Sequence, residues 1–254
     1  MRLKDNGYLP AGIDLNCDLG EGAGHDADII PFITSANISC GYHAGTMSEI
    51  EHTLMLCAAS GVRIGAHPGF PDRANFGRKA MYLTAEQIYK LIAVQLEITD
   101  TLCQKYGALM THMKLHGALY NQTAGDAEMA EPVIRAILDF DPGLEVYGLS
   151  GSLYLHMASE SGLRVRHEVF ADRTYMDDGT LTPRDHPRAF ILTEEQMIRH
   201  VLDMTNAQSV TTVSGFRIHV RAETICLHGD GPSAISFARK LHSLMRIESK
   251  KNEP

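Results

Sequence analysis

Three polar side chains alternate with apolar ones in the segment GIDLNCDLGE, which begins at residue 12. If this segment is a β-strand, Asp14, Asn16 and Asp18 share one face, because successive side chains of a strand point to opposite faces. Parallel strands are usually apolar on both faces, so two buried carboxylates and an amide cost free energy unless a ligand, a cation or a base partners them. The pattern indicates a functional site; the structural alternative is an edge strand with a solvated polar face.

A second polar face, of opposite charge, lies in the segment HMKLHGALYN at 112–121. His112, Lys114 and His116 share one face of the expected strand, and apolar side chains take the other. A lysine between two histidines on an inward face is costly unless a carboxylate or an anionic ligand neutralises it. Because the first segment offers such carboxylates, we expect the two polar faces to meet in one site.

Two further histidines fall where expected strands end. His43 stands among glycines and other small residues, which let the backbone approach a ligand closely. His67 opens a loop rich in proline and glycine that also carries Arg73 and Arg78, and these arginines can hold a carboxylate or a phosphate through bidentate hydrogen bonds. Surface pairing with Asp72 is the structural alternative for either arginine.

The later strand ends repeat this composition. Glu168, Asp172 and Arg173 close the sixth expected strand, and His228 with Asp230 closes the last one. Six strand ends therefore carry His, Asp, Lys or Arg, an arrangement that chance rarely produces. In a (β/α) barrel, catalytic groups gather at these ends.

Short apolar or alternating segments take turns with longer amphipathic ones along the whole chain. The expected strands are 12–18, 35–40, 62–66, 109–114, 144–148, 165–170 and 224–227. The expected helices are 47–59, 85–106, 127–140, 152–159, 194–205 and 232–245. This alternation predicts a parallel sheet with helical crossovers. It leaves an open sheet and a closed barrel possible, but no glycine-rich dinucleotide fingerprint follows the first strand, which favours the barrel.

Length and charge narrow the class of protein. The chain has 254 residues, which suits one α/β-barrel domain over 1–254, and we expect a frayed tail at about 247–254. The formal net charge is −8 with no basic block, so nucleic acid and acidic membrane surfaces are poor partners. No signal-peptide or membrane-spanning apolar run occurs.

The cysteines and the missing motifs exclude several other classes. Five cysteines without a CxxC pair suit neither a disulfide framework nor a structural zinc site, which favours a reduced, cytoplasmic compartment. The chain also lacks a Gly-Lys-Ser/Thr phosphate loop, an HExxH motif and a GxSxG motif. We therefore expect no metal among the site residues.

With these segments in view, the chain resembles the LamB/YcsF family. The resemblance rests on IDLNCDLGEG (13–22), SANISCGYHAG (35–45), GAHPGFPDRANFGRK (65–79), MKLHGALYN (113–121), EVFADRTYMDDGTLTPR (168–184) and ICLHGDGPSAI (225–235). It implies a distorted (β/α) barrel with about seven strands, similar to polysaccharide deacetylase and glycoside hydrolase barrels. It also implies ATP-dependent opening of the lactam of 5-oxo-L-proline to L-glutamate, with ATP and Mg²⁺, by an assembly in which the chain joins subunits B and C of a 5-oxoprolinase.

Two positions depart from the family pattern. Thr46-Met47 stands where the family usually has Asp-Pro, which puts a ligand role near His43 in doubt. Leu115 stands where the family usually has proline, on the face opposite Lys114, so we expect little effect there.

The resemblance and the residue pattern together give each candidate residue a role. The catalytic candidates are Asp14, Asp18, His43, Lys114 and His116. The substrate-binding candidates are Asn16, His67, Arg73, Arg78, Asn121 and Arg173. Lys114 and the loop arginines would stabilise developing negative charge, an aspartate would orient or deprotonate water, and the histidines would move protons.

Two other functions are compatible with the same residues. The first is a metal-dependent amide hydrolase in which Asp18 and two histidines hold a divalent ion. The second is a non-catalytic subunit that binds the lactam or shapes the site of a partner.

Overall fold

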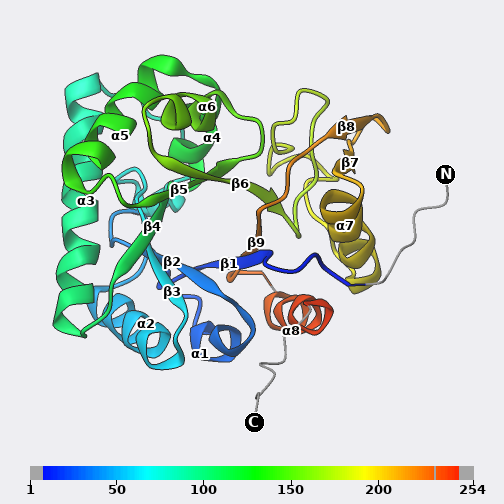
Figure 1. Ribbon diagram of the computed structural model, residues 1–254, viewed down its shortest axis with the longest axis horizontal. Helices are drawn as coiled ribbons and strands as arrows, with labels where there is room; N and C mark the ends of the chain where they lie inside the picture. Colours follow the sequence, from blue (N-terminus) through cyan, green and yellow to red (C-terminus); the bar gives the residue numbers. More distant parts are fainter. Residues whose placement is uncertain (1–7, 232, 246–254) are drawn as a thin grey trace, which may run out of the picture.

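Seven parallel strands close into a barrel at the centre of the protein (Figure 1). The computed structural model describes residues 8–231 and 233–245. In their order around the barrel, the strands are β1 (Asp14–Leu19), β2 (Ser35–Ser39), β3 (Arg63–His67), β4 (Met110–Lys114), β5 (Glu145–Leu149), β6 (Arg164–Phe170) and β9 (Thr224–His228). Strand β9 pairs with both β6 and β1 and so closes the ring. The predicted barrel is thus confirmed, and the open sheet is wrong.

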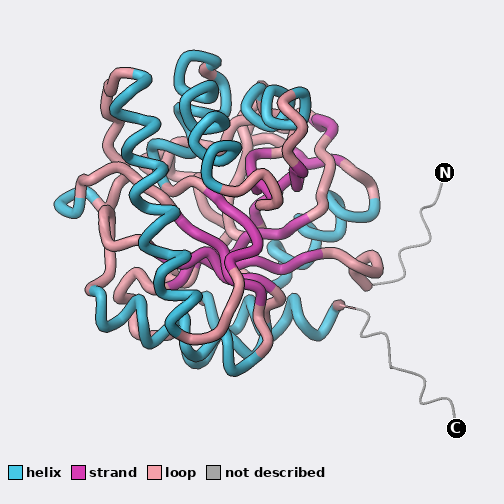
Figure 2. The backbone as a smooth tube through the Cα atoms, turned by 60° about the vertical axis from the view of Figure 1, so that its left-hand side comes forward, coloured by secondary structure: helices cyan, strands magenta, loops and turns pink. Residues whose placement is uncertain are grey.

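Helices form an outer layer around the strands (Figure 2). They are α1 (Asp26–Ile29), α2 (Met47–Ser60), α3 (Ala85–Lys105), α4 (Gly117–Gly125), α5 (Ala127–Phe140), α6 (Leu153–Glu160), α7 (Glu194–Asn206) and α8 (Ala234–Leu244). Each helix and strand expected from the sequence is present, with its ends displaced by no more than two residues. The frayed tail expected at 247–254 lies outside the described residues.

Side-chain caps fix where two of the longer helices begin. Thr84 and Gln87 form the capping box that starts α3. Thr46 and Glu49 form a second capping box at the start of α2. Thr46, at one of the two positions that depart from the family pattern, therefore has a structural role in this chain.

Several short elements do not follow from the sequence pattern. Helix α4 has glycine at both ends and follows directly on the histidine-rich end of β4, where the residue types favour a loop. The antiparallel pair β7 (Ser209–Thr211) and β8 (Arg217–His219) is too short to give a periodic signal. The remaining short elements are α1 and the 3₁₀ turns η1 (Ile30–Phe32) and η2 (Arg73–Asn75).

Strand β1 is packed on both faces, so the edge-strand alternative is wrong. It pairs with β2 on one side and with β9 on the other. Its apolar side chains Leu15, Cys17 and Leu19 lie buried in the hydrophobic core outside the barrel. Its polar side chains lie inside the barrel and are equally buried. The barrel interior is therefore filled with polar groups that must satisfy one another.

A glycine on β3 makes room for a histidine inside the barrel. The register between β3 and β4 shifts at Ile64/Gly65. A Cβ atom on Gly65 would lie 2.3 Å from the imidazole ring of His112, which is far inside van der Waals contact. The absence of a side chain at residue 65 thus lets His112 occupy the barrel interior, where it stacks on Tyr147.

The sequence predicted no disulfide framework and no membrane-spanning segment. All five cysteines are buried and none forms a disulfide. Within residues 8–231 and 233–245, no helix combines the length and the apolarity needed to cross a bilayer.

Candidate functional site

The amino end of the barrel interior is closed around Asp14. Its carboxylate accepts hydrogen bonds from Thr34 at 2.5 Å, Ser35 at 2.8 Å and Thr224 at 2.6 Å, and it pairs with Arg63 at 2.8 Å. Burial raises the pKa of Asp14, but Arg63 and the three hydroxyl groups outweigh burial and hold this pKa below its usual value. The structure thus places Asp14 at the end of β1 away from the rest of the candidate site, with its oxygens already saturated.

The centre of the interior holds the lysine expected on β4. Lys114 Nζ lies 2.9 Å from Asp18 Oδ1 and 2.9 Å from Glu168 Oε1, and it donates to Cys226 Sγ at 3.0 Å. Burial lowers the pKa of Lys114, but Asp18 and its other partners outweigh burial and raise this pKa well above the ordinary value. The acidic face of β1 and the basic face of β4 therefore meet, as the sequence predicted.

Two amide side chains and a histidine lie between Asp14 at the amino end and Lys114 at the centre of the barrel interior. Asn37 Nδ2 donates to Asn16 Oδ1 and to Asp18 Oδ1, both at 2.8 Å. Asn16 Nδ2 donates to Thr224 at 2.7 Å, and His112 Nε2 lies 3.0 Å from Asn37 Oδ1. Asn16, expected to bind substrate, is 0% exposed and holds the interior of the barrel together.

Four side chains gather at the carboxyl end of the barrel. Glu21 Oε1 lies 2.9 Å from His43 Nε2, 3.2 Å from His116 Nδ1 and 3.7 Å from His67 Nε2. His67 Nε2 is also 3.3 Å from Asp18 Oδ2 and 3.0 Å from His116 Nδ1. The structure thus brings together three of the histidines that the sequence singled out, around Glu21, which the sequence pattern did not mark.

The environments of these groups drive their pKa values apart. Burial lowers the pKa of His43 to about 4 and also lowers that of His116. Burial lowers the pKa of His67 too, but Asp18 and Glu21 outweigh it, so this pKa is raised. Burial raises the pKa of Glu21, but its contacts with His116 and His43 outweigh burial and hold this pKa far below its usual value. The sequence pattern misses Glu21 because this residue stands in a glycine-rich loop just beyond the strand.

Arg73 lies in the loop after β3 but has a structural role. Its guanidinium donates to the carbonyl oxygens of Gly41 at 2.7 Å and Gly45 at 2.9 Å, so it ties that loop to the loop after β2. Arg73 is exposed. The structure does not bring it together with Asp18 and Lys114.

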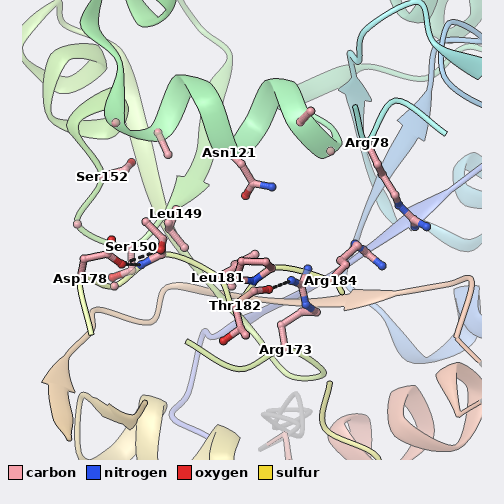
Figure 3. A pocket seen from close by; sticks show the side chains of 18 of the residues that line it. Arg78, Asn121, Leu149, Ser150, Ser152, Arg173, Asp178, Leu181, Thr182 and Arg184 are labelled. Atoms are coloured by element: carbon pink, nitrogen blue, oxygen red, sulfur yellow. Dashed lines mark hydrogen bonds between the residues drawn. The ribbon is translucent and has the colours of Figure 1, made fainter. Parts of the chain in front are cut away.

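Two adjoining cavities open above this cluster. A narrow central pocket of about 40 Å³ has Asp18, His67, Lys114 and His116 among its lining residues. A larger cavity of about 940 Å³ lies beside it. The residues that line both are Arg78, Gly117, Asn121, Arg173, Leu181 and Arg184. Figure 3 shows Asn121 extending from α4 into the larger cavity, with the three arginines gathered at one side.

The shared wall carries three arginine side chains. Arg78 pairs with Asp230 at 2.6 Å, and its Nε is buried with no hydrogen-bond partner among the described residues. Arg173 donates to the carbonyl oxygens of Thr182 and Ala189. Burial, reinforced by Arg184, lowers the pKa of Arg173 to about 10. Guanidinium groups that repel one another in a partly buried wall favour an anionic ligand.

Arg184 was not among the candidates from the sequence. Burial and Arg78 lower its pKa, and it lines both cavities. It stands in a long segment between β6 and α7 that has neither helix nor barrel strand, so no periodic pattern placed it near the site. Only the family motif that ends at residue 184 marked this position.

A second histidine–carboxylate pair faces the central pocket from β9. His228 Nδ1 lies 2.8 Å from Asp172 Oδ2, and the imidazole stacks on Phe170. Because a carboxylate accepts the hydrogen of Nδ1, the lone pair lies on Nε2 of this pocket-lining residue, which is the tautomer that a general base requires. The sequence marked both residues as strand-end groups without assigning them to the site.

Proteins of known sequence and structure resemble this chain along nearly its whole length. The A subunit of the 5-oxoprolinase of Geobacillus thermodenitrificans is 44% identical over 240 residues, which covers 93% of this chain and 94% of the relative. The A subunit of the 5-oxoprolinase of Neisseria meningitidis serogroup C is 47% identical over 229 residues, with 90% and 94% covered. A lactam utilization protein from Thermus thermophilus superposes with a TM-score of 0.84 at 39% identity, with 91% and 95% covered.

The sequence profile of the LamB/YcsF family matches residues 13–254. This range contains every barrel strand and every residue of the site described above. The chain therefore belongs to the LamB/YcsF family.

Proposed function

We propose that this chain is the A subunit of an ATP-dependent 5-oxoprolinase, which opens the lactam of 5-oxo-L-proline to L-glutamate together with subunits B and C in the cytoplasm. The names of its relatives support the lactam and the multi-subunit assembly. The observation that carries the proposal is the buried pair of Lys114 and Asp18, 2.9 Å apart on the floor of a pocket whose wall is rich in arginine.

The chemistry of the substrate explains why such a site would use ATP. A lactam is a resonance-stabilised amide and a poor electrophile. Transfer of the γ-phosphoryl group of ATP to the lactam oxygen turns that oxygen into part of a leaving group and opens the ring carbon to water. Water adds, the ring C–N bond breaks to leave an acyl phosphate, and a second water releases glutamate and phosphate. Each step develops negative charge on oxygen, which positioned cations stabilise.

The arginine wall and the larger cavity fit the phosphate groups of ATP. Guanidinium groups bind phosphate oxygens through paired hydrogen bonds, and Arg78, Arg173 and Arg184 converge on this wall. A volume of about 940 Å³ lies within the range of small-molecule sites. Asp178 and Asp185 line the same cavity and offer the hard oxygen ligands that Mg²⁺ prefers.

The floor of the central pocket would handle water and protons. The low pKa of Asp18 makes it a weak base, so we assign it to orient the attacking water through a hydrogen bond. We assign the proton transfers to His228, since Asp172 fixes its imidazole with one nitrogen toward the pocket. His67 and His116 are less suited to this task, because the ring nitrogens that their backbone contacts leave over lie 3.0 Å from each other. His67 and Lys114 outweigh burial and hold the pKa of Asp18 well below its usual value, and Lys114 would stabilise charge on the lactam oxygen.

The test is glutamate release from 5-oxoproline, measured with ADP formation, by this chain mixed with the B and C proteins. We expect coupled release only when all three proteins and ATP are present. Lys114→Met should lower turnover by more than about 10²-fold, the range for loss of one electrostatic stabiliser. Lys79→Met, the same change at an exposed lysine, should leave turnover unchanged.

Two outcomes would contradict the proposal. Glutamate release that proceeds without ATP would indicate a simple amide hydrolase. Wild-type turnover by the Lys114→Met protein, with folding verified by circular dichroism, would indicate that this chain only binds lactam or supports a partner.

A further inference from the structure

The cluster of Glu21, His43, His67 and His116 has no assigned task in the proposed reaction. One nitrogen or oxygen from each of these four side chains lies within 4.8 Å of the others. The four side chains come from β1, β2, β3 and β4 or from the loops that follow them, at the mouth of the barrel. His67 and His116 also line the central pocket.

The protons on two of these imidazoles are fixed by backbone carbonyl groups. His67 Nδ1 lies 2.8 Å from the carbonyl oxygen of Lys114, and His116 Nε2 lies 2.9 Å from that of Phe76. A carbonyl oxygen only accepts hydrogen bonds, so each of these nitrogens carries the N–H. The remaining nitrogens, His67 Nε2 and His116 Nδ1, therefore face each other at 3.0 Å with their lone pairs. This contact needs a cation between the rings, either an extra proton or a metal ion.

The distances around this contact suit a metal ion. Zinc–ligand distances of about 2.0–2.1 Å place two ligands of a tetrahedral site about 3.3–3.4 Å apart. His67 Nε2, His116 Nδ1 and Glu21 Oε1 are separated by 3.0, 3.2 and 3.7 Å. The rings of His67 and His116 are nearly perpendicular, at 87°, so that both in-plane lone pairs can reach one point.

His43 orients the carboxylate of Glu21 in this arrangement. Its ring is parallel to that of His116, with centroids 3.7 Å apart and an interplanar angle of 5°. Lone pairs in the planes of two parallel rings cannot meet at one ion. His43 Nε2 instead donates to Glu21 Oε1 at 2.9 Å, the role of a residue that positions a metal ligand.

We propose that His67 Nε2, His116 Nδ1 and Glu21 Oε1 bind one divalent transition-metal ion, with Zn²⁺ as the best fit to two imidazoles and a carboxylate. A hydrogen bond orients each of the three ligand side chains, as is usual for metal ligands: backbone carbonyl groups bind the two histidines, and His43 binds Glu21. The site differs from the sequence-based expectation of no metal, because that expectation relied on contiguous motifs.

The fourth coordination position of this site opens on the central pocket. His67 and His116 line that pocket together with Asp18, whose Oδ2 lies 3.3 Å from His67 Nε2. A metal with three protein ligands and one open position is the usual form of a catalytic zinc site. The ligand class for the open position is a water molecule or a carbonyl or carboxylate oxygen, with Asp18 beside it to accept a hydrogen bond.

The test uses this chain alone, after removal of any purification tag and dialysis against a chelator, and so does not depend on the proposed activity. Co²⁺ is added as a spectroscopic probe and Zn²⁺ as a competitor. We expect one equivalent of Co²⁺ with visible d–d absorption, displacement by one equivalent of Zn²⁺, and a rise in melting temperature with either ion. His116→Gln and Glu21→Gln should weaken binding by more than about 100-fold, and His43→Asn by about 10–100-fold.

His112→Gln is the matched control, because His112 is a buried histidine on β4, the strand that leads to His116, and its hydrogen bonds go to Asn37 and Thr111 and not to the three ligands. It should bind Co²⁺ as tightly as the wild type. The proposal fails if the wild type takes up no stoichiometric metal, or if both ligand variants bind as tightly as the control. It also fails if Cys226→Ser abolishes binding and the wild-type spectrum shows a thiolate charge-transfer band, which would place the ion at Asp18, Cys226 and His228 instead. If a ligand variant does not fold, the Co²⁺ absorption spectrum of the wild type and the rise in its melting temperature still test the proposal.

Discussion

The two ends of the barrel interior use the same chemistry to opposite effect. Asp14 and Asp18 lie on one strand, on one face, and both are buried. At the amino end, three hydroxyl groups and Arg63 surround the carboxylate of Asp14. At the carboxyl end, Asp18 lines a pocket and its Oδ2 lies 3.3 Å from His67 Nε2. This nitrogen in turn lies 3.0 Å from His116 Nδ1.

This difference shows what separates a structural carboxylate from a functional one. Both carboxylates remain ionised, because their neighbours hold the pKa of each below its usual value. What differs is whether bonding capacity remains for a molecule from outside. A carboxylate whose partners are all protein groups stabilises the fold, whereas one that faces a pocket can act on a ligand.

Asp18→Asn should have the largest effect on activity. The neutral amide cannot orient water as the carboxylate does and leaves Lys114 with one charged partner fewer. We expect turnover of the reconstituted complex to fall by about 10²-fold or more, the range for loss of orientation of a reacting group. The measurement is ATP-dependent glutamate release, with circular dichroism as the control for folding. Turnover within tenfold of the wild type would mean that the open end of the barrel is not the site of reaction.

Asp14→Asn should act on stability instead. Asp14 is buried but its partner Arg63 is 36% exposed, so we expect the free energy of unfolding in urea to decrease by about 2 kcal/mol, the range for lost hydrogen bonds to a charged group. Turnover per folded molecule should stay within about twofold of the wild type. A large loss of turnover with unchanged stability would reverse the comparison of the two ends.

Acid should weaken the fold through His112. Burial, opposed in part by Asp14, lowers the pKa of His112 to about 3 in the folded protein, against about 6.5 when unfolded. The unfolded chain therefore binds the proton first, so this stabilisation is present above pH 6.5 and is lost as the pH falls. From pH 7 to pH 5 the loss is about 2 kcal/mol. Urea unfolding at both pH values checks it, and His112→Gln should show a smaller decrease; an equal decrease would assign the acid sensitivity elsewhere.

The smallest expected effect is a difference in the KM for ATP between variants of Arg184 and Arg73. Arg184→Gln removes a cation from the wall of the larger cavity and should raise the KM for ATP about tenfold, equivalent to about 1.4 kcal/mol. Arg73→Gln removes an exposed contact to two backbone carbonyls and should leave this KM unchanged. Equal values for the two variants would exclude the arginine wall as the phosphate site.

The fold was predictable because alternation of short strands and amphipathic helices directly reports burial. The apolar stripe and the capping box of α3, for example, set its start at Ala85. Helix α4 was not predictable, because its nine residues with a glycine at each end carry almost no amphipathic signal. Such short elements are fixed by tertiary packing.

The sequence predicted where in the fold the site lies, but only some of the residues that form it. The alternation on β1 and β4 marks Asp18 and Lys114, and the structure brings them together. The same alternation also marks Asp14 and Asn16, because a side-chain period of two does not tell one end of a strand from the other. Glu21 and Arg184 lie in loops, where the path of the chain depends on contacts that no local pattern encodes.

The close approach of Gly65 to His112 means that these two positions cannot change independently. An alanine at residue 65 would collide with the imidazole, and the ring stacked on Tyr147 has little room to retreat. A smaller residue at 112 would relieve that collision but would remove the hydrogen bond to Asn37, which in turn holds Asp18. Gly65, which has no side chain, thus sets through two intervening residues, His112 and Asn37, the position of the carboxylate on which the reaction is proposed to depend.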